Sequence, residues 1–167
     1  MPTTADRYRR WFDYEKDSHE KVLVSLLSVP ANNRPSPSYQ KAVDLFAHII
    51  MGRRLWLFRF GSATEPPRDL FPQSVSLEEL ACRLQEMEAL WSSFLSRLDD
   101  VELARSFDYR SLDAGWFRNT VEDILTQLHG HSLYHRGQIA SLVRACGGEP
   151  AATDFVYWAR EAIPSRG

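Results

Sequence analysis

The chain has 167 residues and a formal net charge of −2 at pH 7, so it lacks the positive charge that binding to nucleic-acid phosphates needs. Its two cysteines, Cys82 and Cys146, lie far apart, which argues against a disulfide framework and suits a reducing cytosol. Residues 1–17 are charged and have no apolar stretch typical of a signal peptide, and no apolar run approaches the length of a membrane span. We therefore expect one domain, residues 1–167, in the cytoplasm, without a membrane or nucleic-acid partner.

Two long helical patterns fill the first part of the chain. In residues 4–27, apolar side chains recur at helical spacing, and Glu15 and His19 fall on the same face. Pro30 and the stretch 32–35 end this helix. The second helix is expected to begin at Ser36-Pro37, with serine as N-cap and proline at the first helical position, and to run to Phe60 before Gly61. Its apolar residues are Ala42, Leu45, Phe46, Ile49 and Trp56, and His48 lies among them.

Two further helices are predicted after a proline-rich connection. Ser76 and Glu79 predict a capping box at the start of the third helix, which is followed by a regular apolar stripe: Leu80, Leu84, Met87, Trp91, Phe94 and Leu98. Residues 106–116 look irregular, with a turn or short hairpin around Asp113-Ala114-Gly115. The fourth helix is expected to start at Asn119, with Glu122 as capping partner, and to end at Gly147-Gly148.

The overall pattern favours an all-α fold. A short closing element, residues 154–162, is expected to pack back on the helices. No segment of useful length alternates with the period of two that a strand requires. Four amphipathic helices in one small domain therefore predict a four-helix bundle.

Two histidines occupy positions on the fourth helix where a bundle normally places leucine. His131 and His135 are four residues apart, so they lie on the same helix face with Cβ atoms about 5–6 Å apart. They are close enough to share one metal ion. The alternative is that each ring is a core residue that hydrogen-bonds a neighbouring carbonyl or hydroxyl, because an unpaired buried imidazole nitrogen is costly.

His48 adds a third imidazole from a separate helix, and bundles build metal sites from side chains on facing helices. Three histidines without a fourth ligand leave the open coordination position that catalysis needs. His19 lies on the apolar face of the first helix, where it could support the ligands from behind, serve as a fourth ligand or act as a general base. Gln138 lies three residues beyond His135, where it either orients a bound molecule or pairs with a buried polar group. His129 faces another direction and is expected to be partly exposed, and both cysteines are expected to be small buried residues.

The run from His131 to Gln138 reads HSLYHRGQ and resembles the HxxxHRGQ signature of the DinB/YfiT-like proteins. Weaker similarity to the family's second helix, third helix and closing segment extends over nearly the whole chain: residues 45–49, 55–57, 76–80, 94–99 and 150–161. The sequence departs from the family pattern at Asp17 and His19 in the first helix, and at Gly52-Arg53-Arg54 in the second, where an acidic residue often follows the histidine.

The resemblance implies an up-down-down-up four-helix bundle with His48, His131 and His135 as ligands of nickel or zinc, often in a homodimer. Some members of this family are transferases or isomerases that use low-molecular-weight thiols, and others are regarded as metal-dependent hydrolases. Our first hypothesis is therefore a metal-dependent enzyme, a thiol-dependent S-transferase or a hydrolase, acting on a small molecule. The alternative is a non-catalytic metal-binding or stress-response bundle that serves as a dimeric binding module.

Overall fold

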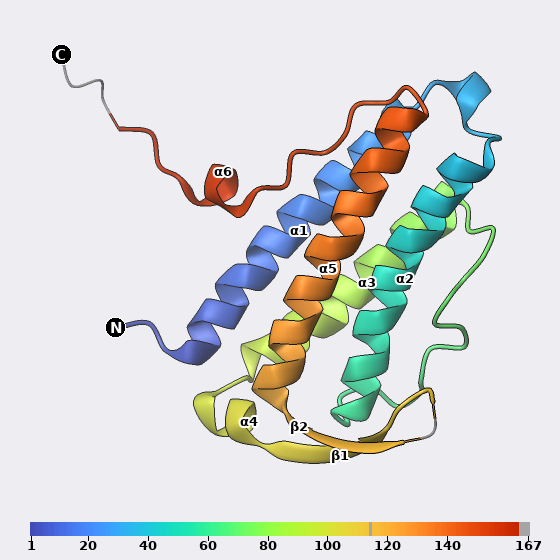
Figure 1. Ribbon diagram of the computed structural model, residues 1–167. Helices are drawn as coiled ribbons and strands as arrows, with labels where there is room; N and C mark the ends of the chain where they lie inside the picture. The colour runs from blue at the N-terminus through green and yellow to red at the C-terminus, as the bar shows by residue number, and fades with distance from the viewer. Residues whose placement is uncertain (114, 164–167) are drawn as a thin grey trace.

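The structure, a computed structural model, describes residues 1–113 and 115–163, and most of them belong to four long helices (Figure 1). The long helices are α1 (Thr4–Ser28), α2 (Pro37–Arg59), α3 (Leu77–Ser96) and α5 (Val121–Ala145). The short elements are the 3-10 turn η1 (Ala31–Asn33), the helices α4 (Asp100–Ala104) and α6 (Phe155–Ala159), and the strands β1 (Ser106–Arg110) and β2 (Trp116–Thr120). The fold is thus mostly helical, as expected, with a small sheet added.

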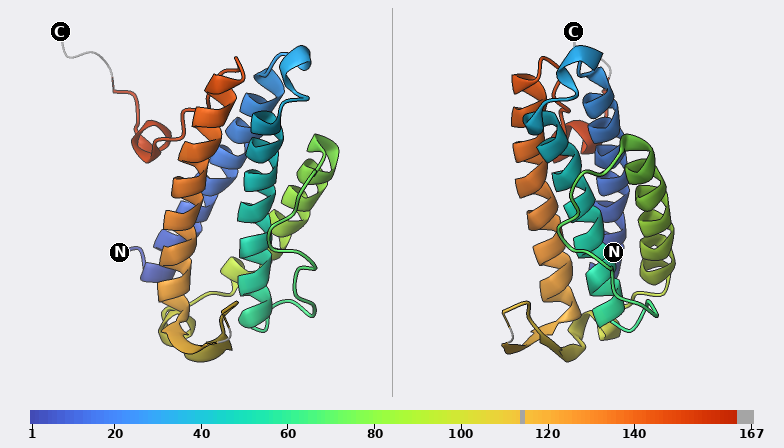
Figure 2. Two further views of the ribbon diagram at one scale, coloured as in Figure 1. Left: turned by 45° about the vertical axis from the view of Figure 1, so that its right-hand side comes forward. Right: turned by 90° about the vertical axis from the view of Figure 1, so that its right-hand side faces the viewer.

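The four long helices lie side by side (Figure 2). Their buried apolar residues form one hydrophobic core. Helix α2 packs against α5 and α3, and α1 packs against the same two helices. The apolar stripes predicted from the sequence face inward, and the largest fully buried side chains include Trp91, Tyr14 and Phe46. The close packing of α2 on α5 matters most for function, because it brings together two helices that carry histidines.

The helix starts follow local capping chemistry. Ser36 accepts a hydrogen bond from the backbone N–H of Tyr39, and Pro37 stands at the first helical position, as predicted. Ser76 likewise accepts the N–H of Glu79, but the Glu79 carboxylate pairs with Arg83 and does not complete the predicted capping box.

The predicted capping pair at the start of the fourth helix, Asn119 with Glu122, is wrong by one residue. Thr120 is the N-cap of α5 and forms a capping box with Asp123. Asn119 still belongs to β2, where it pairs with Phe107. At the other end Gly147 adopts a φ of +79°, as expected for a glycine just beyond a helix.

Of the two alternatives for residues 106–116, a turn or a short hairpin, the structure has the hairpin, although the sequence predicted no segment of useful length with strand-like alternation. β1 and β2 form an antiparallel hairpin, with Ser106 opposite Thr120 and Arg110 opposite Trp116. Phe107 and Tyr109 alternate with more exposed polar neighbours, so the period of two is present, but only over five residues. Of the predicted turn Asp113-Ala114-Gly115, Ala114 lies outside the described residues.

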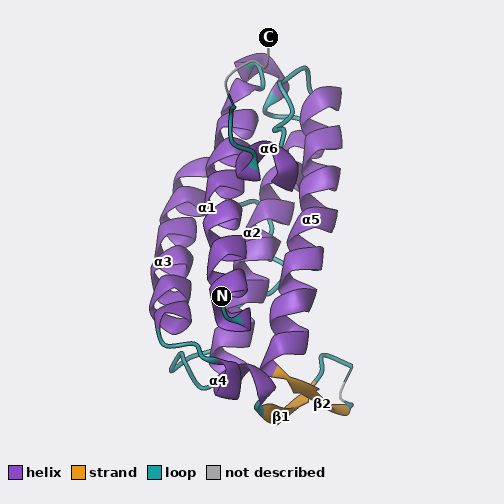
Figure 3. Cartoon of the chain, turned by 90° about the vertical axis from the view of Figure 1, so that its left-hand side faces the viewer, coloured by secondary structure: helices purple, strands orange, loops and turns teal. Residues whose placement is uncertain are grey.

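The closing element lies on α1, as expected, although its helix spans only Phe155–Ala159 (Figure 3). The Tyr14 ring contacts Phe155 and Trp158 with centroid distances of 5.2 and 5.8 Å, and the Tyr14 hydroxyl donates to the carbonyl of Thr153. None of the five residues in α6 is buried, so this element covers the bundle without joining its core. No helix in the described part of the chain is long and apolar enough to cross a membrane.

Candidate metal centre

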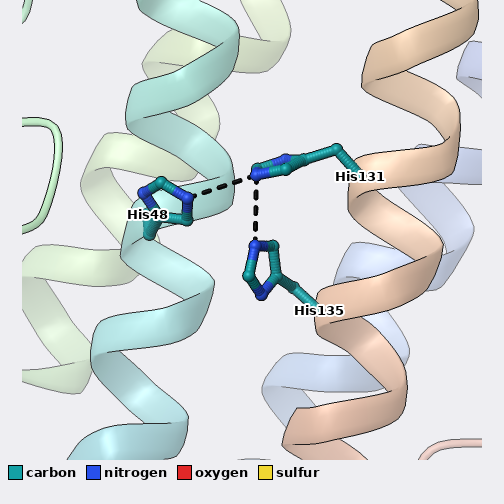
Figure 4. A group of neighbouring side chains, drawn as sticks. All are labelled: His48, His131 and His135. Atoms are coloured by element: carbon teal, nitrogen blue, oxygen red, sulfur yellow. Dashed lines mark hydrogen bonds between the residues drawn. The ribbon is translucent and has the colours of Figure 1, made fainter. Parts of the chain in front are cut away.

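His48 on α2 meets His131 and His135 on α5, and the three Nε2 atoms point toward one another (Figure 4). Nε2 of His131 lies 3.2 Å from Nε2 of His48 and 3.1 Å from Nε2 of His135. One ligand nitrogen from each ring lies within 4.8 Å of the others, a spacing suited to a single ion between them. All three side chains are half-buried.

The helices place these rings for simple reasons. The spacing of four residues puts His131 and His135 on one face of α5. Gly52, one turn after His48 on α2, lies against the His131 ring: a Cβ built at this glycine would stand 3.7 Å from Cε1 of His131. The His131 ring therefore packs against α2 at van der Waals distance, close to the His48 ring.

The outer nitrogens of two rings have hydrogen-bond partners. Nδ1 of His48 lies 2.7 Å from the carbonyl oxygen of Leu70, and Nδ1 of His135 lies 2.7 Å from Oε1 of Gln138. A carbonyl oxygen only accepts hydrogen bonds, so each Nδ1 donates its N–H and each Nε2 carries a lone pair. The same arrangement orients metal-binding histidines in proteins generally.

The Nε2 lone pairs of His48 and His135 suit the binding of a cation. Neutral His131 has a single N–H, so its Nε2 cannot satisfy the lone pairs of both His48 and His135. Burial, together with the neighbouring His135 and His48, lowers the pKa of His131 to about 4, and burial also lowers the pKa of His135. Imidazoles must be neutral to bind metal, and these shifts favour the neutral form.

Two cavities flank the cluster. One, of about 420 Å³, is lined by His48 and His131 together with residues of α2, α5 and the hairpin. The other, of about 520 Å³, is lined by His48 and His135 with the first half of α2 and residues 71–74. Leu70 and Phe71 lie on His48 between them, and the Phe71 ring stacks on the imidazole at a centroid distance of 4.7 Å. Both volumes are in the range of small-molecule binding sites.

His19 does not join this group. It is fully buried, and its Nδ1 lies 2.8 Å from Glu88 while its Nε2 lies 3.7 Å from Glu15. The structure therefore places His19 in a separate polar network, with no contact to the three converging histidines that would make it a fourth ligand or a base beside them.

That network was not anticipated from the sequence. Glu15 accepts hydrogen bonds from Arg53 on α2 at 2.8 Å and from Arg136 on α5 at 2.7 Å, and all three side chains are buried. Arg53 also donates to Ser132, one residue from His131. Burial alone would raise the pKa of Glu15, but the charges of the two arginines outweigh it and lower the pKa to about 2. The network ties α1 to both histidine-bearing helices.

The remaining candidates, His129, Cys82 and Cys146, lie outside the histidine group. His129 is partly exposed, as expected, and stacks on Trp11 at a centroid distance of 4.7 Å. Cys146 is buried, as expected, but Cys82 is exposed, because it lies on the solvent side of α3, beside the apolar stripe. Neither cysteine belongs to the histidine group.

Comparison with known proteins settles the family. The model of the DinB family matches residues 1–166. The chain belongs to the DinB family. Protein DinB of Bacillus subtilis (strain 168) is 22% identical over 152 residues, which cover 86% of this chain and 88% of the relative. No solved structure is significantly similar to the chain. DinB membership agrees with the resemblance of the HxxxHRGQ run, whose two histidines are among the three that converge here.

Proposed function

We propose that His48, His131 and His135 bind one divalent metal ion, zinc or nickel, and that this DinB protein is an enzyme acting on a small molecule. The convergence of the three Nε2 atoms carries the proposal. Imidazole nitrogens suit zinc and nickel alike, and the choice of these two metals rests on the family resemblance.

The number of ligands favours catalysis over a purely structural role. Structural zinc sites in proteins are closed by four protein ligands, whereas catalytic sites use three and keep a position open. Among the described residues, no cysteine, aspartate, glutamate or further histidine joins the three. When bound, the ion would supply Lewis acidity and lower the pKa of a water or thiol in its open position.

The protein's own groups hold and cover the site. The Leu70 carbonyl and the Gln138 side chain fix the orientation of the His48 and His135 rings, as their distances of 2.7 Å indicate. Phe71 stacks on His48 and limits the access of water from that side. Substrate is expected to enter through one of the two flanking cavities.

The carboxylates near the site favour thiol transfer over hydrolysis. Hydrolysis uses a general base within hydrogen-bond reach of the attacking water. Asp44 accepts the backbone N–H groups of Ser74 and Val75, so it holds the connection after α2. Asp113 is exposed and accepts the Ser111 hydroxyl. A thiol ionised by a metal needs no such base, so we propose a low-molecular-weight thiol as one substrate.

The proposal includes the architecture that the family resemblance implies, an up-down-down-up bundle that forms a homodimer. η1 joins α1 and α2 at one end, whereas α4 and the hairpin lie between α3 and α5 at the other, which supports that order (Figure 1). Sedimentation of the purified protein tests the dimer.

Metal content tests the site directly. Protein purified without a histidine tag is expected to contain about one equivalent of zinc or nickel, and His48→Ala, His131→Ala and His135→Ala are each expected to lose it. His129→Ala is the matched control, because His129 lies on α5 but outside the cluster. Circular dichroism checks that each variant stays helical. A wild-type protein that takes up no added zinc or nickel would refute the proposal and favour the non-catalytic bundle.

A further inference from the structure

Arg59 lines the same cavity as His48 and His131, at the far end of α2. The α2 residues that line this cavity lie on one face of the helix: His48, Gly52, Leu55, Trp56 and Arg59. His48 and Arg59 are separated by 11 positions, or about 16 Å along a helix axis. The cavity of about 420 Å³ thus runs from the histidines toward a guanidinium group.

Aromatic rings and a carbonyl hold the Arg59 side chain in place. Its Cζ atom lies 4.5 Å from the centroid of the Trp56 ring and 4.8 Å from that of the Tyr109 ring. One terminal nitrogen donates to the backbone carbonyl of Arg110 at 2.8 Å. The guanidinium is therefore fixed before any ligand arrives, and a fixed group loses less conformational freedom on binding.

The charge of Arg59 has no acidic partner within the part of the chain that the structure describes, unlike the neighbouring arginines of α2. Arg53 pairs with Glu15, and Arg54 pairs with Glu86. Arg59 has no such carboxylate: Asp113 lines the same cavity, but it accepts the Ser111 hydroxyl and forms no ion pair with Arg59. Within the described residues, the Arg59 guanidinium forms one hydrogen bond, to Arg110, and its side chain lines the cavity.

We propose that Arg59 binds the carboxylate of an extended small-molecule substrate whose other end reaches His48 and His131. The inference rests on the proposed function for what happens at the histidine end, but not for the anion site itself. A planar guanidinium suits a carboxylate, with which it forms charge-assisted hydrogen bonds. The negative charge of Asp113 in the wall disfavours more highly charged groups such as phosphate.

Between the histidines and Arg59, the residues that line the cavity suit a substrate with an apolar middle segment. Leu55, Leu70 and Leu128 line the cavity together with Trp56 and Tyr109. A thiol with a long aliphatic or aromatic spacer and a terminal carboxylate would place its sulfur near the histidines and its carboxylate near Arg59. A short mercapto acid cannot span both ends.

Ligand pairs that differ only in charge test the proposal. Binding of 8-mercaptooctanoate and its amide is measured by calorimetry on the zinc-loaded wild type, on Arg59→Gln and on Arg54→Gln. The wild type and the Arg54→Gln control are expected to bind the carboxylate about tenfold or more tightly than the amide, since a hydrogen-bonded charge pair is lost with the amide. In Arg59→Gln this preference is expected to disappear. The preference for 3-mercaptopropionate over its amide is expected to be nearly the same in the wild type and in Arg59→Gln.

Measurements on metal-free protein separate this inference from the proposed function. If zinc binds but the wild type shows no preference for the carboxylate, or binds neither long ligand, the inference is wrong and the metal site stands. If zinc does not bind, the proposed function fails, while a carboxylate preference that depends on Arg59 in the metal-free protein still supports the anion site. A preference that survives in Arg59→Gln overturns the assignment to this residue.

Discussion

Oε1 of Gln138 lies 2.7 Å from Nδ1 of His135, three residues earlier on α5. The bond fixes the tautomer of His135, so that its Nε2 presents a lone pair toward His131. The histidine cluster thus depends on a residue that is not itself a ligand candidate.

We predict that Gln138→Ala weakens zinc binding by about 10–100-fold, the usual cost of removing a group that orients a ligand. The affinity is measured by competition with a zinc chelator of known strength. Gln85→Ala, an exposed glutamine on α3, is the control and is expected to bind zinc as the wild type does. Equal affinities in the two variants would contradict an orienting role for Gln138.

Metal binding should also appear as added stability. Zinc at about 100 times its dissociation constant stabilises a folded protein by about 2.7 kcal/mol, or about 5–10 °C in Tm for a chain of this size. We predict this shift for the wild type and for His129→Ala, and its loss in His131→Ala. Thermal unfolding with zinc and with a chelator measures it. A full zinc shift in His131→Ala would show that the ion binds elsewhere.

Local geometry explains which part of the site the sequence could predict. His131 and His135 meet because four residues make about one helical turn, and their spacing can be read directly from the sequence. The approach of His48 depends on how α2 packs on α5, and the contact with the Leu70 carbonyl involves a backbone atom of a loop. Neither of these two contacts of His48 can be predicted from the spacing of residues along the chain. His48 is predicted from its place among the apolar residues of a neighbouring helix, and the resemblance to the DinB family supports that choice.

The missed features have different causes. Phe107 and Tyr109 alternate with polar residues as a strand requires, but five residues are too short a run to stand out from an irregular segment. Glu15 was visible on the inward face of the first helix, but its partners Arg53 and Arg136 lie on other helices. Tertiary packing decides the burial of Glu15, because a buried charge is acceptable only where an opposite charge reaches it.

Removing the central charge of that network should be costly. We predict that Glu15→Gln lowers the free energy of unfolding by about 3–5 kcal/mol, because Arg53 and Arg136 then remain buried without a counter-charge. Urea denaturation measures the change. Glu20→Gln, an exposed position on the same helix, is the control and should stay within about 0.5 kcal/mol of the wild type. Similar urea midpoints for the two variants would mean that Glu15 contributes little.

The same carboxylate predicts a dependence on acid. The pKa of Glu15 is about 2 in the folded protein, below its ordinary value of 4.5, so between these two values the unfolded chain binds more protons. The stability that ionised Glu15 provides is therefore fully present above about pH 4.5 and is lost as the pH falls toward 2. Urea unfolding from pH 6 to pH 3 measures the difference in stability between wild type and Glu15→Gln, which should shrink across this window. A Glu15 difference that is independent of pH would contradict the lowered pKa.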